Sequence, residues 1–194
     1  MRPIFKVGLA CLLGTFVAIG AMGSSRAPYV LKAHADIAGA PGSGVSGSVV
    51  FMQFDDGILP TVQVVVTVNG LPPNTKHGFH IHEVGSCGDN PGPPVVPFGG
   101  AGGHFDPGPA GNSSPPDANH PFHMGDLPNL EASGSGRATF VHTTSRITLS
   151  KGPLSILDAN GSAVIVHALE DKGTTGAPPG AGGGRIACGI VKPD

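Results

Sequence analysis

Residues 61–68 read Thr-Val-Gln-Val-Val-Val-Thr-Val, and this stretch decides the fold class of the chain. Valine stands at every second position, at residues 62, 64, 66 and 68. Successive side chains of a β-strand point to opposite faces of a sheet, so these four valines would share one face. The alternation predicts a strand with one continuous apolar face. Asn69 and Gly70 follow it and predict a turn.

Similar short strand patterns recur on both sides of this segment, separated by turn residues, whereas helical periodicity is hard to find. We predict strands at residues 29–38, 45–54, 77–83, 137–142, 162–168 and 185–191, with weaker patterns at 146–149 and 154–157. Many short strands between glycine- and proline-containing turns are typical of an all-β domain. The predicted fold is therefore a Greek-key β-sandwich or flattened barrel of about eight antiparallel strands.

Composition restricts the possible functions. A length of 194 residues suits one domain with a real core. The net charge of −2 provides no basic field for nucleic acid, so no nucleic-acid partner is expected. Glycine and proline are concentrated in two places: residues 85–116 hold 9 Gly and 8 Pro, and residues 173–184 hold 6 Gly and 2 Pro. We predict two long loops on a β scaffold, and loops of that length in a compact domain are usually functional.

The N-terminus has the pattern of a secretion signal. Arg2 and Lys6 precede an uncharged, mostly apolar stretch at residues 7–22, and small residues stand at Ala21 and Gly23. We predict a signal peptide at 1–23, a short linker at 24–29 and one domain at 30–194, exported to the periplasm, the cell envelope or the medium. The alternative is an uncleaved membrane anchor, and only then would the chain have a membrane partner.

Two cysteines remain once the predicted signal peptide, which contains Cys11, is set aside. They are Cys87 and Cys188, which are 101 residues apart. An even pair in an exported domain favours one disulfide, and the alternative is two free buried thiols.

Histidines and one acid form patterns typical of metal sites. His80 and His82 stand two apart on a predicted strand, so both imidazoles would point the same way and could hold one ion; the alternative is a polar surface pair. A second set comprises three histidines and an aspartate in and just after the first predicted loop: His104, His120, His123 and Asp126. Three nitrogens and one oxygen suit four-coordinate Zn²⁺, whereas the alternative is a solvated polar loop.

His167 ends the apolar run at residues 163–166. A lone histidine at a strand end is usually a satisfied polar residue. It gains meaning if it meets His80 and His82 in space, with His104 shared between the two sets. Four imidazoles around one ion suit a redox-active Cu(II) better than Mg²⁺ or Ca²⁺.

Five segments, in this order along the chain, resemble the signature segments of the Cu/Zn superoxide dismutases, most closely the bacterial exported branch. The segments are Gly78-Phe79-His80-Ile81-His82-Glu83, Gly103-His104-Phe105-Asp106-Pro107, His123-Met124-Gly125-Asp126-Leu127-Pro128-Asn129-Leu130, Val164-Ile165-Val166-His167 and Gly184-Arg185-Ile186-Ala187-Cys188-Gly189-Ile190. The resemblance covers roughly residues 30–192 and implies a β-sandwich of immunoglobulin-like architecture.

The resemblance also implies roles for individual residues. Copper would be bound by His80, His82, His104 and His167, and zinc by His104, His120, His123 and Asp126. His104 would bridge the two ions and Arg185 would attract and orient superoxide, as the two catalytic residues. Asp171 would link a zinc histidine to a copper histidine, and Cys87 would pair with Cys188. The implied reaction turns two superoxide radicals into dioxygen and hydrogen peroxide as copper is alternately reduced and oxidised, with zinc in a structural role.

The chain departs from the family pattern in two places. The gap from His104 to His120 is 16 residues, longer than expected, and the run between Lys172 and Arg185 contains no charged residue. Three further histidines match no ligand position: His34, His77 and His142. Alternative functions are a non-catalytic metal carrier and an adhesion sandwich. The chain would be a monomer or a homodimer.

Overall fold

The computed structural model describes residues 29–55, 57–90, 92–108, 122–173 and 182–194. Its elements are ten strands and one short 3₁₀-helix: β1 (Tyr29–Gly39), β2 (Ser46–Asp55), β3 (Thr61–Asn69), β4 (Lys76–His77), β5 (Phe79–His82), η1 (Gly99–Ala101), β6 (Leu130–Glu131), β7 (Ala138–Thr144), β8 (Ala163–His167), β9 (Arg185–Ile190) and β10 (Lys192–Pro193).

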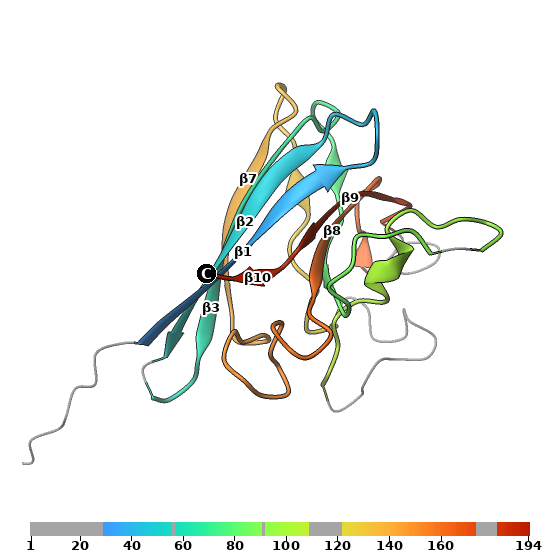
Figure 1. The fold of residues 1–194 in the computed structure, drawn as a ribbon. Helices are drawn as coiled ribbons and strands as arrows, with labels where there is room; N and C mark the ends of the chain where they lie inside the picture. The colour runs from blue at the N-terminus through green and yellow to red at the C-terminus, as the bar shows by residue number, and fades with distance from the viewer. Residues whose placement is uncertain (1–28, 56, 91, 109–121, 174–181) are drawn as a thin grey trace, which may run out of the picture.

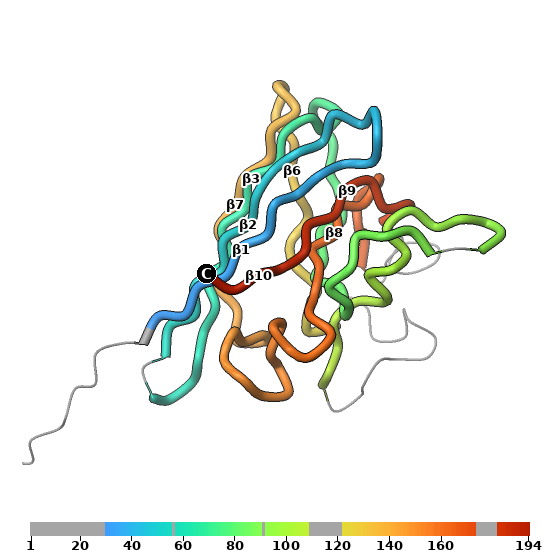
Figure 2. Tube along the Cα trace, in the orientation of Figure 1, coloured from blue at the N-terminus to red at the C-terminus, as the bar shows by residue number. Residues whose placement is uncertain are grey.

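The strands form one curled antiparallel sheet of eight strands, in the order β5-β8-β9-β1-β2-β3-β7, with β10 paired to β1 (Figures 1 and 2). A second, two-stranded sheet pairs β4 with β6. Because β4 directly precedes β5 and β6 leads into β7, this small sheet connects the two edges of the large one. The chain passes from β3 through β4 of the small sheet to β5, and from β7 to β8, and both connections join strands that are not neighbours in the large sheet. The predicted all-β class with about eight antiparallel strands is confirmed.

The valine alternation of β3 produces the predicted buried face. Val62, Val64, Val66 and Val68 are at most 1% exposed, and each buried valine contributes about 1.5–3 kcal/mol to the free energy of folding. Phe79 of β5 meets Phe140 of β7 edge to face, with ring centroids 5.9 Å apart. The core therefore joins the β3–β7 side of the barrel to the strands that carry the histidines.

The two weaker strand predictions, at residues 146–149 and 154–157, were wrong. Only a single bridge joins Thr148 to Ser155, and no strand forms in either segment. Ile147, Leu149 and Ile156 are buried, so the apolar pattern reflects the core rather than a ladder. The side chain of Gln53 accepts hydrogen bonds from the backbone N–H groups of residues 149 and 150, which replaces a strand partner there.

Two long connections contribute residues to the site, as predicted. Residues 83–129 join β5 to β6, and residues 168–184 join β8 to β9. Cys87 in the first connection forms a disulfide with Cys188 of β9, with Cα atoms 5.7 Å apart, so the predicted pairing is confirmed. No helix within the described ranges is long and apolar enough to span a bilayer. The predicted signal peptide at 1–23 lies outside those ranges.

Candidate metal centre

Two groups of metal-binding side chains meet inside the domain. In each group the possible ligand atoms lie within 4.8 Å of one another. The first group comprises four histidines from β5, β8 and the first long connection: His80, His82, His104 and His167. The second comprises His104, His123 and Asp126. One imidazole, that of His104, belongs to both groups.

Backbone hydrogen bonds of Ile81 hold the two groups together. Its N–H donates to the carbonyl of Gly125 at 2.9 Å, and its carbonyl accepts the N–H of Phe105 at 2.9 Å. These bonds place residues 104–105 and 125–126 along the free edge of β5. At Gly125 an added Cβ would lie 2.4 Å from the carbonyl oxygen of Ile81, so the close approach requires glycine. The local sequence therefore fixes His104 and Asp126 beside His80 and His82.

Two histidines of the first group each present one unprotonated nitrogen to the site. The Nδ1 of His82 donates to the carbonyl of Gly102 at 3.0 Å, and the Nδ1 of His167 donates to the carbonyl of Gly183 at 3.2 Å. A carbonyl oxygen can only accept, so Nδ1 carries the proton in both rings and Nε2 holds a lone pair. Both Nε2 atoms are buried and have no hydrogen-bond partner among the described residues. A copper ion, which imidazole nitrogens bind well, could accept these two unpaired lone pairs.

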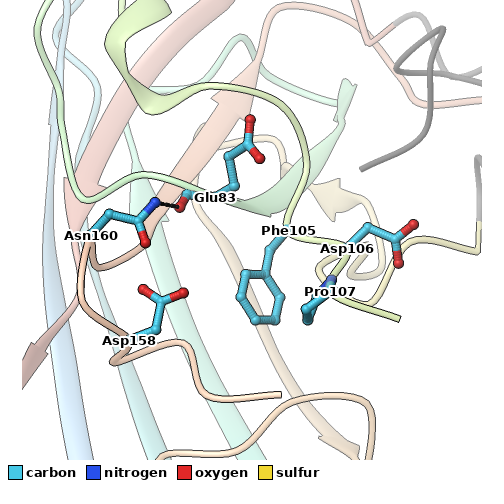
Figure 3. Close-up of a pocket in the computed structure, with 6 residues that line it drawn as sticks. All are labelled: Glu83, Phe105, Asp106, Pro107, Asp158 and Asn160. Atoms are coloured by element: carbon cyan, nitrogen blue, oxygen red, sulfur yellow. Dashed lines mark hydrogen bonds between the residues drawn. The ribbon is translucent and has the colours of Figure 1, made fainter. Parts of the chain in front are cut away.

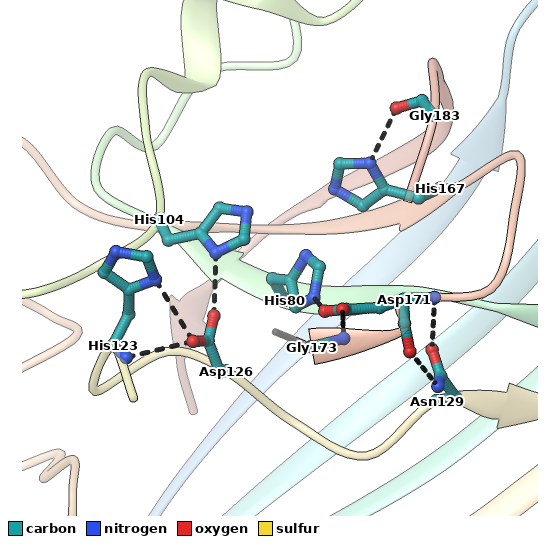
Figure 4. Close-up of polar contacts among 9 residues, drawn as sticks. All are labelled: His80, His104, His123, Asp126, Asn129, His167, Asp171, Gly173 and Gly183. Atoms are coloured by element: carbon teal, nitrogen blue, oxygen red, sulfur yellow. Dashed lines mark hydrogen bonds and ion pairs between the residues drawn. The ribbon is translucent and has the colours of Figure 1, made fainter. Parts of the chain in front are cut away.

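Asp171 orients the third imidazole, as Figure 4 shows. The Nε2 of His80 donates to the carboxylate of Asp171 at 2.7 Å, which leaves the Nδ1 of His80 as the nitrogen available to a metal. The side-chain amide of Asn129 accepts from the N–H of Asp171 at 3.0 Å and donates to its carbonyl at 2.8 Å. The carboxylate also accepts the N–H of Gly173 at 2.7 Å. Asp171 thus ties the chain segment between β8 and β9 to the histidine group.

Burial keeps the rings of His82, His104 and His167 neutral. It lowers the pKa of His104 to about 4, against the opposing effect of its hydrogen bond to Asp126. It lowers the pKa of His167 to about 3, with a smaller contribution from His80, and lowers the pKa of His82 well below its ordinary value. A neutral imidazole is the form that binds metals, so the site is prepared for a cation at neutral pH.

The second group has the donor chemistry of a zinc site. The carboxylate of Asp126 accepts from Nδ1 of His104 at 2.7 Å and from Nδ1 of His123 at 3.1 Å (Figure 4). The backbone N–H of His123 donates to the same carboxylate at 2.9 Å. Two ring nitrogens and a carboxylate oxygen thus converge, and Zn²⁺ would replace the two ring protons. The predicted fourth ligand, His120, lies outside the described residues.

Arg185, the first residue of β9, is tied to the first long connection. Its Nη1 donates to the carbonyl of Phe98 at 2.7 Å, and its Nη2 donates to the carbonyl of Gly102 at 2.6 Å. Gly102 also accepts from His82, so one carbonyl positions both the guanidinium and an imidazole. Burial lowers the pKa of Arg185 from its ordinary value, but a guanidinium stays protonated in proteins. The result is a fixed cation next to the histidine group.

Glu83 fixes the other side of the first connection and lines a shallow pocket with Phe105, Asp106, Pro107, Asp158 and Asn160 (Figure 3). Its Oε1 accepts the N–H of Gly103 at 2.8 Å, and its own N–H donates to the carbonyl of Gly103 at 3.0 Å. Asn160 donates to its backbone carbonyl at 3.0 Å. These bonds hold the residue next to His104 in place.

His77 has a role that the sequence did not indicate. It is 2% exposed, and its Nδ1 donates to the carbonyl of His167 at 2.8 Å. The Nε2 lies 2.7 Å from the hydroxyl of Thr75. His77 thus supports the backbone of His167, which is 90 residues away in the chain. In the sequence, only its position three residues before His80 could have indicated a role near the site.

Comparisons with known proteins agree with this geometry. The family model described as copper/zinc superoxide dismutase (SODC) matches residues 45–191. The chain belongs to the copper/zinc superoxide dismutase family. A Cu-Zn superoxide dismutase of Deinococcus radiodurans is 39% identical over 135 residues, covering 67% of this chain and 70% of that protein. Cu-Zn superoxide dismutase 1 of Aquifex aeolicus is 34% identical over 168 residues, covering 84% of this chain and 88% of that protein.

A solved structure supports the same family at the level of the fold. The crystal structure of a double mutant of a SOD-like protein from Bacillus subtilis has a TM-score of 0.61 and 33% sequence identity. The match covers 81% of this chain and 95% of that one. Copper and zinc are the cofactors that membership of the copper/zinc superoxide dismutase family implies, and the two side-chain groups fit them.

We predict that Asp171→Asn weakens copper binding by roughly 10- to 100-fold, because loss of the carboxylate removes the charge that holds the Nε2 proton of His80. Competition titration of purified protein with a copper chelator measures the affinity. Asp158→Asn, which neutralises an exposed carboxylate outside both groups, is the matched control. An Asp171→Asn variant with unchanged copper affinity would contradict this role.

Proposed function

We propose that this protein is a superoxide dismutase, which converts two superoxide radicals and two protons into dioxygen and hydrogen peroxide. The observation that carries the proposal is the shared imidazole of His104, which belongs to a group of four histidines and to a histidine and carboxylate group. Family membership supports the same activity. Bound copper supplies the redox chemistry, because it can accept one electron and return it.

The proposed ligand sets follow from these two groups. Copper would be held by His80, His82, His104 and His167, and zinc by His104, His120, His123 and Asp126. The buried Nε2 atoms of His82 and His167 support the copper set. His120 enters the zinc set from the sequence alone, and Asp171 and His77 act as positioning residues behind the copper histidines.

His104 is proposed to bridge the two ions and to carry a proton. Its Nδ1 faces Asp126 on the zinc side, which leaves Nε2 for the copper side. When Nε2 is not bound to a metal it can hold a proton and donate it to the developing peroxide. Zinc has no redox chemistry, so its proposed part is to fix the ring through Nδ1.

Arg185 is proposed to attract and orient the superoxide anion. Two backbone carbonyls hold the guanidinium in place, and its remaining N–H groups can donate charge-assisted hydrogen bonds to an anion. No charged residue lies between Lys172 and Arg185 in the sequence, so the arginine would supply most of the local attraction.

Export is also proposed, to the periplasm, the cell envelope or the medium. The disulfide between Cys87 and Cys188 is consistent with an oxidising compartment. The apolar segment at residues 7–22 supports the same location.

The activity is tested with purified protein loaded with one copper and one zinc per chain. We expect catalytic loss of superoxide with release of peroxide, and no activity after removal of copper. Loaded protein that retains both metals but leaves superoxide decay at the uncatalysed rate would instead indicate a metal carrier and refute the proposal.

We predict that Arg185→Ala retains both metals but lowers kcat/KM by roughly 10- to 100-fold, since a hydrogen bond to a charged group contributes about 1.5–3 kcal/mol. The dependence of the rate on ionic strength should weaken as well, because the screened charge is gone. Arg137→Ala, which removes an exposed arginine of the β6–β7 turn, is the matched control. Full activity in metal-replete Arg185→Ala protein would rule out the proposed role.

A further inference from the structure

The turn that carries His123 and Asp126 is closed by its own hydrogen bonds. The N–H of Asp126 donates to the carbonyl of His123 at 3.1 Å, and the N–H of His123 donates to the carboxylate of Asp126 at 2.9 Å. The same carboxylate accepts from Nδ1 of His123 (Figure 4). These bonds fix the two side chains relative to each other, but they do not fix the turn relative to the rest of the protein.

Two hydrogen bonds from outside the turn hold it against the barrel. Toward its C-terminal end, the carbonyl of Gly125 accepts the N–H of Ile81 at 2.9 Å, which attaches the turn to β5. Directly before the turn, the carbonyl of Phe122 accepts a hydrogen bond from Nη2 of Arg146. Phe122 is 64% exposed, so burial of its ring does little to hold this residue. The backbone bond to Arg146 therefore anchors the N-terminal end of the turn.

Arg146 is itself held firmly at the end of the large sheet. It follows β7 by two residues, and its N–H donates at 3.1 Å to the hydroxyl of Thr144, the last residue of that strand. The next residue, Ile147, is 0% exposed and belongs to the core. The backbone of Arg146 is thus fixed on both sides. Its side chain connects this fixed point to Phe122, which lies 24 residues earlier in the chain.

We propose that Arg146 is a positioning residue for the zinc site. By holding the carbonyl of Phe122, it sets the place of the His123 ring, which is 2% exposed and lies 5.1 Å from the ring of His104 between centroids. A ligand whose backbone is already fixed loses less freedom when it binds an ion, so the anchor favours zinc binding. The inference rests on the proposed zinc ligands and is independent of the catalytic activity.

The charge of Arg146 acts in the opposite direction, which makes the two effects separable. A guanidinium repels a nearby dication, so its charge alone would weaken zinc binding. Arg146 is partly exposed, and salt and water screen such a charge. Removal of the guanidinium therefore lowers the zinc affinity if position dominates, and raises it if charge dominates. We expect position to dominate.

The test titrates the purified, metal-free full chain with Zn²⁺ in competition with a zinc chelator. Arg146→Met keeps an unbranched side chain and removes every donor, so we expect zinc affinity to fall by roughly 10-fold or more, the scale of a lost outer hydrogen-bond partner. Arg146→Lys restores an N–H donor and the charge, and should recover most of the loss. Arg137→Met, which replaces an exposed arginine directly before β7, is the matched control and should leave zinc affinity unchanged.

Co²⁺ bound in place of zinc provides a second readout, because its visible absorption depends on the arrangement of its ligands rather than on the stability of the fold. The spectrum of Arg146→Met should differ from that of the unaltered protein, and the spectrum of Arg146→Lys should match it. Unchanged or higher zinc affinity in Arg146→Met would overturn the inference, as would a loss that Arg146→Lys does not reduce or that Arg137→Met shares. An unaltered protein that binds no zinc would overturn the proposed zinc ligands as well.

Discussion

Replacement of His104 by alanine is expected to weaken both metal sites at once. The ring lies 4.1 Å from that of His80 and 5.1 Å from that of His123, measured between centroids, and belongs to both ligand groups. Loss of a direct ligand should lower each affinity by more than the roughly 10- to 100-fold typical of an outer hydrogen-bond partner. Separate copper and zinc titrations of the His104→Ala protein measure the two affinities.

His142→Ala is the matched control for this titration, since His142 of β7 belongs to neither ligand group. It should leave both affinities unchanged. A His104→Ala protein in which only one metal is weakened would show that the imidazole serves a single ion.

Loss of the disulfide should produce the largest change in stability. The bond closes a chain segment of 101 residues, and in the chain-entropy model such a closure contributes about 4–5 kcal/mol. It also holds the first long connection against β9, where Arg185 binds the carbonyls of Phe98 and Gly102. We expect the metal-free Cys87→Ala/Cys188→Ala protein to lose roughly that much free energy of unfolding in a denaturant titration.

Chemical reduction of the unaltered metal-free protein provides the control, because it breaks the same bond without removing a buried side chain. Both treatments should lower the free energy of unfolding by similar amounts. A loss of less than about 1 kcal/mol in both would mean that the connection is held by its other contacts.

The strands could be predicted because their signals are local. The alternating valines of β3 need only a period of two to reveal a buried face, and the same holds for the longer strands. The segment at 146–157 could not be predicted correctly, because Ile147, Leu149 and Ile156 carry a strand-like apolar pattern. The backbone N–H groups of Leu149 and Ser150 bond the side chain of Gln53, almost a hundred residues earlier, and this contact has no local signature.

The metal ligands could be proposed from the sequence because the histidines and Asp126 stand in recognisable spacings within segments that resemble those of a known family. The groups that orient them could not. The carbonyls of Gly102 and Gly183 set the protonated nitrogen of His82 and His167, and a backbone carbonyl is the same at every position. His77 acts in the same way through the carbonyl of His167, so its role depends on the folded arrangement.

The most direct test of the shared imidazole is a crystal structure of the copper- and zinc-loaded protein, with anomalous diffraction recorded at the absorption edges of both metals. The account predicts one copper peak and one zinc peak on opposite sides of the His104 ring, with Nδ1 on the zinc side. A single peak, or two peaks of which only one contacts that ring, would contradict it.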